Sequence, residues 1–447
     1  VVMLAKMFQA IIVTVVRLLL PFAASFTLIP TMYYALKHMI HDARTRILTS
    51  TLLLAWPLTF FITTTPQALS NLLLLLVIFL CFEQVWHNDD RRRLQEYTER
   101  ASAYKLLPFI LALASLAIHP LSGIPAVLFV LIFFCFSSQR LLSRIFGALI
   151  LFFSSGIFLM LFGLKKNTTT ISLSTLFAPP RIANKFLIVQ DFIYTYAFNI
   201  HWIVLLLMFG GTWMVYKKTK KKRVFLFPVF FLAMILNYLL VTIYSDFSFL
   251  ISYEQQNYAI RIFEIAFYFL FPLALVALSS FLQKLFEQQR WTKIFFAFVF
   301  AIILATSLYL SYPQHNRYVT GRNFNLTPTD IQAVHFIKKD ATGKKYAVLA
   351  NQMVSAAALQ EFGFVNFYQT QNGELFYYPI PTSSPTYEIY LEMVNRSPTR
   401  ERALQAMNLM QTDIIYLVLN DYWWGYETLV EQAKKNADEV FSIENGK

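Results

Sequence analysis

The sequence predicts a polytopic α-helical membrane protein with a small C-terminal α/β domain, and three observations support this fold class. Of its 447 residues, 57% are hydrophobic and only 14% are charged, whereas soluble domains carry about 25% charged residues. The mean hydropathy is +0.50. The first 310 residues hold 26 basic and 11 acidic residues, whereas the remainder holds 12 and 14. This composition excludes a disordered chain, a coiled coil and an ordinary cytosolic enzyme.

A helix needs about 20 apolar residues to cross a hydrocarbon core of about 30 Å. Within residues 1–310 we predict about ten transmembrane helices, at 10–36, 47–63, 68–82, 106–118, 124–136, 145–164, 199–216, 224–243, 260–282 and 293–310. Between the fourth and fifth, Pro120, Gly123 and Pro125 indicate a turn, because proline removes a helix hydrogen bond and clashes with the preceding turn. The stretch 186–198 is a candidate interfacial helix.

The loops between these helices alternate in charge. Every second loop is basic, and the run 217–223 alone contains six Lys or Arg residues. The positive-inside rule places these loops in the cytoplasm. We therefore expect an integral membrane protein whose first helix runs inward and whose residues 311–447 lie outside the cytoplasm. The basic run is a tight loop between two helices, which makes it a topology anchor and excludes nucleic acid as a partner.

Residues 311–447 alternate helix and strand signals, which is typical of a small α/β layer domain. A helix opens at Thr327, which is a suitable N-cap before Pro328. We predict strands at 346–350, 413–419 and 440–443. The other predicted helices lie at 353–361, 386–395, 400–410 and 426–436. No G-x-G-x-x-G, P-loop, nucleophile elbow or His/Cys metal spacing is present.

Three local motifs stand in a recognisable order. They are the apolar run 52–61 followed by Pro66 and Gln67, the turn 119–123, and the stretch 258–261 that opens a long helix containing Pro272. This order resembles the GT-C superfamily of membrane glycosyltransferases. The resemblance implies hexosyl or pentosyl transfer from a polyprenyl-phosphate carrier to an unknown acceptor at the outer face, in a bacterial or archaeal plasma membrane.

The resemblance also implies where the catalytic base lies. In the family the base is an acidic residue on the first external loop, between helices one and two. The first helix here runs from outside to inside, as the family's second helix does. If the resemblance holds, the acid lies upstream of Val1. No catalytic residue is therefore assigned.

Ionisable side chains at membrane depth are costly, which makes them functional candidates. Arg261 lies at the outer mouth of the ninth predicted helix, where its guanidinium would hold the carrier phosphate. Alternatively, it reaches the headgroups or pairs with Glu264 one turn along. Arg17 would make a second phosphate contact, or it would pair with Glu264 or another acid and hold the bundle together.

The remaining candidates come from the matching motifs and the outer acidic groups. His119 could donate to a phosphate or a sugar hydroxyl, or it could cap the helix that follows. Tyr258 opens the stretch 258–261 and is counted with the substrate-binding residues. Glu264, like Asp246 and Glu254, could bind the acceptor or a divalent ion. No two of these acids share a metal-ligand spacing, so no metal site and no cofactor is predicted.

Two other functions remain open from the sequence. A transporter or lipid flippase would share the apolar helices, but the chain has no internal repeat and no pair of interrupted helices in matching halves. A large external α/β domain would also be unexplained. A non-catalytic membrane scaffold of the same architecture is the third interpretation.

Overall fold

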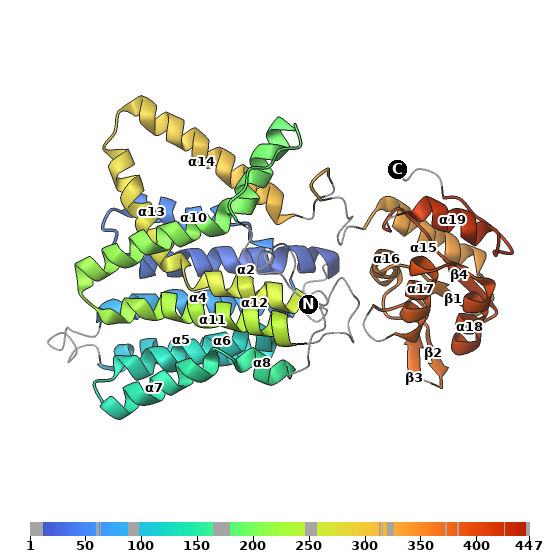
Figure 1. The fold of residues 1–447 in the computed structure, drawn as a ribbon, viewed down its shortest axis with the longest axis horizontal. Helices are drawn as coiled ribbons and strands as arrows, with labels where there is room; N and C mark the ends of the chain where they lie inside the picture. Colours follow the sequence, from blue (N-terminus) through green and yellow to red (C-terminus); the bar gives the residue numbers. More distant parts are fainter. Residues whose placement is uncertain are drawn as a thin grey trace. The chain divides into compact units, whose positions relative to one another are not determined.

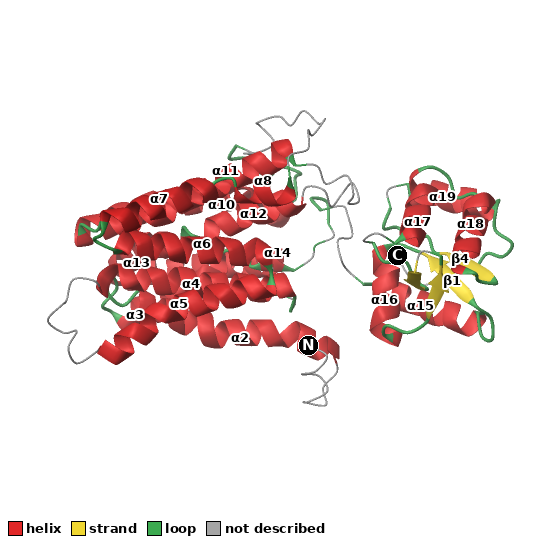
Figure 2. Cartoon of the chain, turned by 90° about the horizontal axis from the view of Figure 1, so that it is seen from below, coloured by secondary structure: helices red, strands yellow, loops and turns green. Residues whose placement is uncertain are grey.

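The computed structural model describes residues 12–59, 62, 64–87, 98–163, 179–245, 257–312, 314, 316–319, 326–371, 373–381, 384–423 and 425–443. The chain divides into two compact units. The first comprises Val1–Asp246 and Gln256–Tyr312, and the second comprises Phe247–Gln255 and Pro313–Lys447. The first unit is helical, whereas the second mixes helices and strands (Figures 1 and 2).

The first unit is a bundle of helices. In chain order they are α2 (Ile12–Ala35), α3 (Ala43–Thr51), η1 (Leu52–Ala55), α4 (Pro66–His87), α5 (Thr98–Ile118), α6 (Pro120–Ser137), α7 (Leu141–Ser154), α8 (Ile157–Phe162), α10 (Ile188–Thr219), η3 (Lys222–Phe225), α11 (Leu226–Tyr244), α12 (Asn257–Tyr268), α13 (Phe271–Phe286) and α14 (Arg290–Ser311). By length and composition, six described helical segments are able to cross a membrane. Together α12 and α13, bent by 47°, make a seventh. These helices indicate an integral membrane protein in a lipid bilayer.

The structure differs from the prediction of about ten straight crossings in two respects. The segments Leu106–Ile118 and Leu141–Ser154 are apolar but shorter than the other spans. The predicted crossing at 47–63 is not one helix, because η1 ends at Ala55 and Trp56 is extended, with ψ of 128°. Pro57 explains this change, since a proline disfavours the helical conformation of the residue before it.

The segment between α2 and α4 nevertheless returns the chain along the bundle. Near the end of α4, Glu83 approaches His38, which follows α2, with 3.6 Å between Oε1 and Nε2. At the other end, the Leu20 amide of α2 donates to the hydroxyl of Thr64, just before α4, at 3.1 Å. The two helices therefore run in the same direction, and residues 43–65 connect their opposite ends.

Contacts between loops gather basic residues at one end of the bundle. The Lys218 ammonium donates to the His38 carbonyl at 3.0 Å, and the Arg223 guanidinium donates to the Ser137 carbonyl at 3.1 Å. Three loops that are far apart in the sequence therefore meet here. We call this the basic end, and it comprises residues 37–46, 137–144 and 217–223.

The opposite end of the bundle, called the far end, contains the turn between α5 and α6. Ser70, in the first turns of α4, donates to the His119 carbonyl at 3.2 Å. Its hydroxyl also lies 2.7 Å from that of Ser115. Because α11 begins at the basic end beside η3, it ends at the far end, where α12 then begins. The start of α12 and the His119 turn thus share one end.

A buried asparagine holds the break between α7 and α8. The Asn237 side chain of α11 donates to the Ser154 carbonyl at 2.6 Å. Its oxygen accepts from the Phe158 amide at 3.1 Å. Asn237 is fully buried. These bonds serve backbone groups that the interrupted helix would otherwise leave unpaired.

We expect Asn237→Leu to lower the stability of the bundle by about 2–3 kcal/mol, because two buried backbone groups lose their partners. Thermal unfolding in detergent would measure this change. Leu236→Val, at the exposed neighbouring position, is the control and should melt like the native protein. A native melting temperature for Asn237→Leu would contradict the assignment.

The second unit contains two small sheets among its helices. The elements are α15 (Pro328–Asp340), β1 (Tyr346–Leu349), α16 (Gln352–Phe362), β2 (Phe367–Thr370), β3 (Gly373–Phe376), α17 (Pro385–Asn395), α18 (Arg400–Met410), β4 (Ile414–Leu417) and α19 (Tyr426–Lys434). Strand β1 pairs with β4 in parallel, Tyr346 opposite Ile414. Strands β2 and β3 form an antiparallel hairpin.

One strand prediction in this unit was wrong, and one hairpin was missed. Residues 440–443 form no strand, and the exposed Phe441 ring instead packs on Phe336, with 4.9 Å between centroids. The β2–β3 hairpin was not predicted. Its sequence signal is the pair Asn372-Gly373, since glycine suits the positive φ of 94° found at Gly373.

Tyrosines form much of the core of this second unit. Tyr377 and Tyr378 are fully buried, and Tyr346 nearly so. The rings of Tyr346 and Tyr377 meet at 5.5 Å. Burial, together with the charges of the neighbouring tyrosines, raises the pKa values of Tyr346 and Tyr378 well above the usual range for tyrosine.

We expect the stability of this unit to fall as pH rises above about 10, the ordinary tyrosine pKa. Above that pH the unfolded chain loses phenolic protons that the folded core retains, so deprotonation favours unfolding. Tyrosinate absorbance and near-UV circular dichroism should change together. In Tyr378→Phe the loss of stability at high pH should be smaller, because the variant lacks one of these phenol groups. The Tyr378 hydroxyl is buried without a hydrogen-bond partner among the described residues. Tyrosinate formation without unfolding would contradict the prediction.

Candidate functional site

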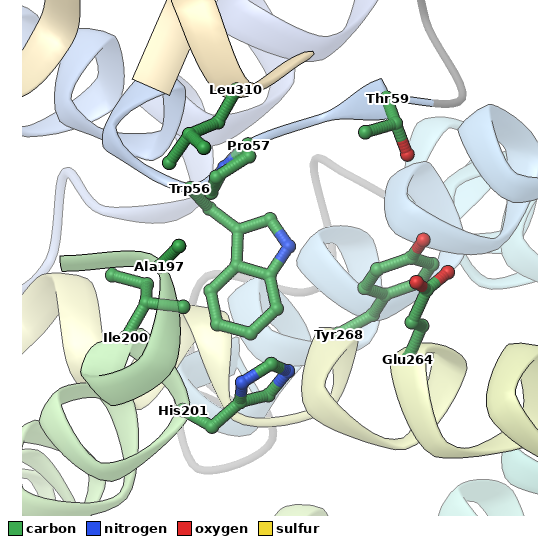
Figure 3. A pocket seen from close by; sticks show the side chains of 9 residues that line it. All are labelled: Trp56, Pro57, Thr59, Ala197, Ile200, His201, Glu264, Tyr268 and Leu310. Carbon is green, nitrogen blue, oxygen red and sulfur yellow. The ribbon is translucent and has the colours of Figure 1, made fainter. Parts of the chain in front are cut away.

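A cavity of about 220 Å³ lies within the first unit, between the segment after η1 and the helices α10, α12 and α14 (Figure 3). Its lining residues are Trp56, Pro57, Thr59, Ala197, Ile200, His201, Glu264, Tyr268 and Leu310. Pockets for drug-sized ligands occupy about 300–1,000 Å³. The cavity therefore suits one small group. We call it the Trp56 pocket.

Aromatic contacts fix one wall of the Trp56 pocket. The Trp56 ring stacks on Phe267 at 5.6 Å between centroids and meets His201 edge-on at 4.8 Å. The Tyr196 hydroxyl donates to the Ala55 carbonyl and ties this segment to α10. The extended segment at Trp56 thus gives a rigid ring surface.

Three ionisable side chains line the Trp56 pocket: Glu264 and Tyr268 of α12, and His201 of α10. Within the described part of the chain no hydrogen bond is made to the Glu264 carboxylate, which faces the cavity (Figure 3). The indole nitrogen of Trp56 lies on the side of its ring toward Glu264 and Tyr268. A carboxylate acceptor and an indole donor therefore border one small apolar space.

Arg261 lies one helical turn before Glu264, near the start of α12. Its charge acts on Glu264 and on His119, which links α12 to the turn between α5 and α6. The guanidinium carbon lies 5.9 Å from the centre of the Tyr258 ring. Arg261 therefore interacts with three other predicted substrate-binding residues, Glu264, His119 and Tyr258, at the far end.

His119 caps α6. Its Nδ1 accepts from the Leu121 amide at 3.3 Å, as the capping interpretation required. This bond assigns the ring proton to Nε2. Burial, and then the charge of Arg261, lower the pKa of His119, which favours the neutral ring at pH 7. The Nε2–H group is therefore a neutral donor beside the arginine.

The residues of the Trp56 pocket differ from the sequence-based candidates at two positions. Arg17 is exposed on α2 and does not line the Trp56 pocket. His201 was missed, although it is ionisable and lies in an apolar span, which is the criterion that selected Glu264. The position of Trp56 could not be predicted, because its neighbours come from helices far along the chain.

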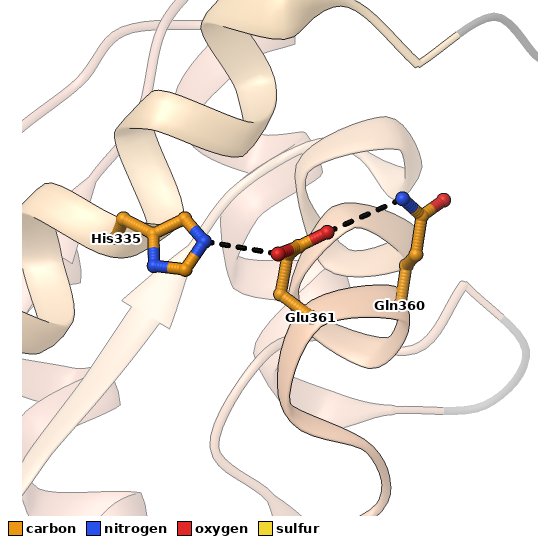
Figure 4. Close-up of polar contacts among 3 residues, drawn as sticks. All are labelled: His335, Gln360 and Glu361. Atoms are coloured by element: carbon orange, nitrogen blue, oxygen red, sulfur yellow. Dashed lines mark hydrogen bonds and ion pairs between the residues drawn. The ribbon is translucent and has the colours of Figure 1, made fainter. Parts of the chain in front are cut away.

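The second unit offers a less convincing site. His335 of α15 lies 3.0 Å from a Glu361 oxygen of α16, and Gln360 donates to the other oxygen at 3.2 Å (Figure 4). The pair is exposed, and such pairs contribute little. Across the described residues no group of three or more His, Cys, Asp or Glu side chains could hold a metal ion.

Comparison with protein-family models, with curated proteins and with solved structures found no match for this chain. The chemistry of the Trp56 pocket and of Arg261, one turn before Glu264, is therefore the basis for a proposed function.

Proposed function

We propose that the chain is a GT-C-type membrane glycosyltransferase that moves a sugar from a polyprenyl-phosphate carrier to an acceptor at the outer face. One observation carries the proposal: Arg261, His119 and the Trp56 pocket gather away from the basic end. The positive-inside rule makes the basic end cytoplasmic. The far end, and the second unit that follows α14, are then extracytoplasmic.

Arg261 and His119 would hold the carrier phosphate. A guanidinium presents a planar fork of donors that matches phosphate oxygens, and charge-assisted bonds of this kind are strong. The His119 Nε2–H would add a neutral donor. When the sugar leaves, negative charge grows on the phosphate, and these donors would stabilise it. The Tyr258 ring lies beside the guanidinium and favours its position.

The Trp56 pocket would hold the sugar ring. Its volume suits one sugar ring, whose hydroxyl groups would donate to Glu264 and whose carbon face would pack against the Trp56 ring. Arg261 and Glu264 are three residues apart, which corresponds to about 4.5 Å of helix rise. A phosphate and the sugar attached to it span a comparable distance. Arg17, which lies outside the pocket lining, has no role in this proposal.

The proposal is tested with purified protein in nanodiscs and polyprenyl-phosphate carriers loaded with labelled hexoses or pentoses. With water in place of the unidentified acceptor, we expect hydrolysis of the loaded carrier to polyprenyl phosphate and free labelled sugar for one sugar class. Glu264→Gln should reduce turnover, whereas Glu287→Gln, an exposed acid near the start of α14, should not. Movement of the intact loaded lipid between leaflets without cleavage would instead favour a flippase and contradict the proposal.

A further inference from the structure

A loop is fastened along the first turns of α10. Asn199 of α10 accepts from the Arg181 amide at 3.1 Å and donates to the Arg181 carbonyl at 2.8 Å. About one turn closer to the helix start, the Thr195 hydroxyl accepts from the Ala183 amide at 2.9 Å. The loop thus runs antiparallel to the helix. We call residues 181–199 the strapped hairpin.

The tip of the strapped hairpin holds a strained aromatic residue. The Asp191 carboxylate accepts from the amides on either side of Phe186, that of Lys185 at 3.1 Å and that of Leu187 at 3.0 Å. Between them, Phe186 has a φ of 58°, a left-handed conformation that is unfavourable for a bulky side chain. The residue is 90% exposed. Strain of this kind persists where the surroundings impose it, and it clusters at functional positions.

The surface around Phe186 is apolar with basic residues among it. Ile182 and Ile188 are 83% and 91% exposed, and Val189 is also exposed. Lys185 and Arg181 are exposed as well. The Arg181 guanidinium lies 3.9 Å from the centre of the Phe198 ring. Large apolar side chains presented this openly indicate an interaction surface.

The length of α10 indicates that this surface lies at the edge of the membrane. Its 32 residues extend about 48 Å at about 1.5 Å per residue, which exceeds a hydrocarbon core of about 30 Å by roughly 12 residues. The strapped part, residues 188–199, has this excess length, and Figure 1 shows the start of α10 turned away from the line of the rest of the helix. This part can therefore lie along the bilayer surface instead of projecting about 18 Å beyond the hydrocarbon core. Further along the same helix, Leu206, Phe209 and Trp213 are also exposed.

We infer that the strapped hairpin is an interfacial anchor that lies in the headgroup region of the leaflet at the far end. Phe186, Ile182 and Ile188 insert at the boundary with the acyl chains, and Arg181 and Lys185 bind lipid phosphates. Apolar side chains interspersed with cations are the combination that binds anionic membrane surfaces. The inference does not depend on the proposed glycosyltransferase activity.

Spin labels on single introduced cysteines test the anchor in nanodiscs containing anionic lipid. Labels at Phe186→Cys, at Leu206→Cys on the membrane-facing part of α10 and at Lys339→Cys on α15 are compared. Labelling of the native chain, in which Cys81 is buried and Cys135 is only partly buried, gives the background. We expect the label at 186 to be shielded from a water-soluble relaxation agent, like that at 206. Accessibility equal to that at 339 would overturn the anchor. So would strong label–label coupling at 186 that disappears in discs with one copy, because it would assign the surface to a second copy.

A second variant separates insertion from folding. Glycine adopts a positive φ without strain, so Phe186→Gly should not lower the melting temperature in detergent. It should nevertheless raise the accessibility of a label at Ile188→Cys severalfold, because the largest inserted side chain is gone. Unchanged accessibility at 188 would show that Phe186 does not hold the hairpin at the membrane.

Discussion

Arg261→Ala should abolish cleavage of the loaded carrier while the protein still folds. The variant removes the charged donor that the proposed phosphate site depends on, and loss of one such donor lowers turnover by about 100- to 1,000-fold. Carrier binding should weaken by about 10- to 100-fold, which corresponds to a charge-assisted hydrogen bond. Because Arg261 is only partly buried, its truncation should change the melting temperature little. Turnover in nanodiscs and binding of unloaded polyprenyl phosphate would measure the two effects.

Two controls give this result its meaning. Arg261→Lys keeps the charge but loses the fork of donors, so it should recover binding more than turnover. Arg290→Ala removes an exposed arginine at the start of α14 and should leave both quantities unchanged. Native turnover in Arg261→Ala would remove the arginine from the phosphate site, whatever the sugar.

Gly211→Ala should prevent the bundle from forming its native packing. A Cβ atom at this position of α10 would lie 1.8 Å from the Leu273 carbonyl oxygen and 2.6 Å from its carbonyl carbon. Backbone atoms cannot rotate away as a flexible side chain can. The helices α10 and α13 would therefore have to separate, which should cost about 3 kcal/mol or more. The reduction should appear as a lower melting temperature and a smaller folded fraction in detergent.

The adjacent glycine provides a matched control. At Gly210 the added Cβ would lie 3.7 Å from the Ala277 methyl group, an ordinary contact, and alanine favours helix more than glycine does. Gly210→Ala should therefore melt at or above the native temperature. Similar melting of the two variants would contradict the close approach of α10 and α13 at Gly211.

Local patterns were sufficient to predict most of the helices but not the interrupted ones. The runs at 68–82 and 293–310 lie inside α4 and α14, because a long apolar run needs only its own backbone to satisfy its hydrogen bonds. At 47–63 the composition alone favoured a span, yet Pro57 ends the helical conformation at Trp56. Apolar composition does not distinguish a helix from an extended segment that other helices cover.

The site was predicted in part for the same reason. Arg261 and Glu264 were found because each is an ionisable residue in an apolar helix. Their proximity to His119 depends on how α12 packs beside the α5–α6 turn, and one sequence contains no direct signal of that packing. The Trp56 pocket combines residues from 56 to 310, so its shape follows from tertiary contacts alone.

The irregular return between α2 and α4 has a consequence for how the protein enters the membrane. Residues 56–58 lie outside any helix, so their polar backbone groups are not all paired within a helix, and lipid offers them no partner. One helix that helps to cover this stretch is α14, which packs against η1. The helix α14 is synthesised more than 200 residues later. This stretch must therefore remain at the translocation machinery or the membrane surface until the last helices emerge. Insertion of the chain is then completed out of sequence order, with one of its earliest segments settling last.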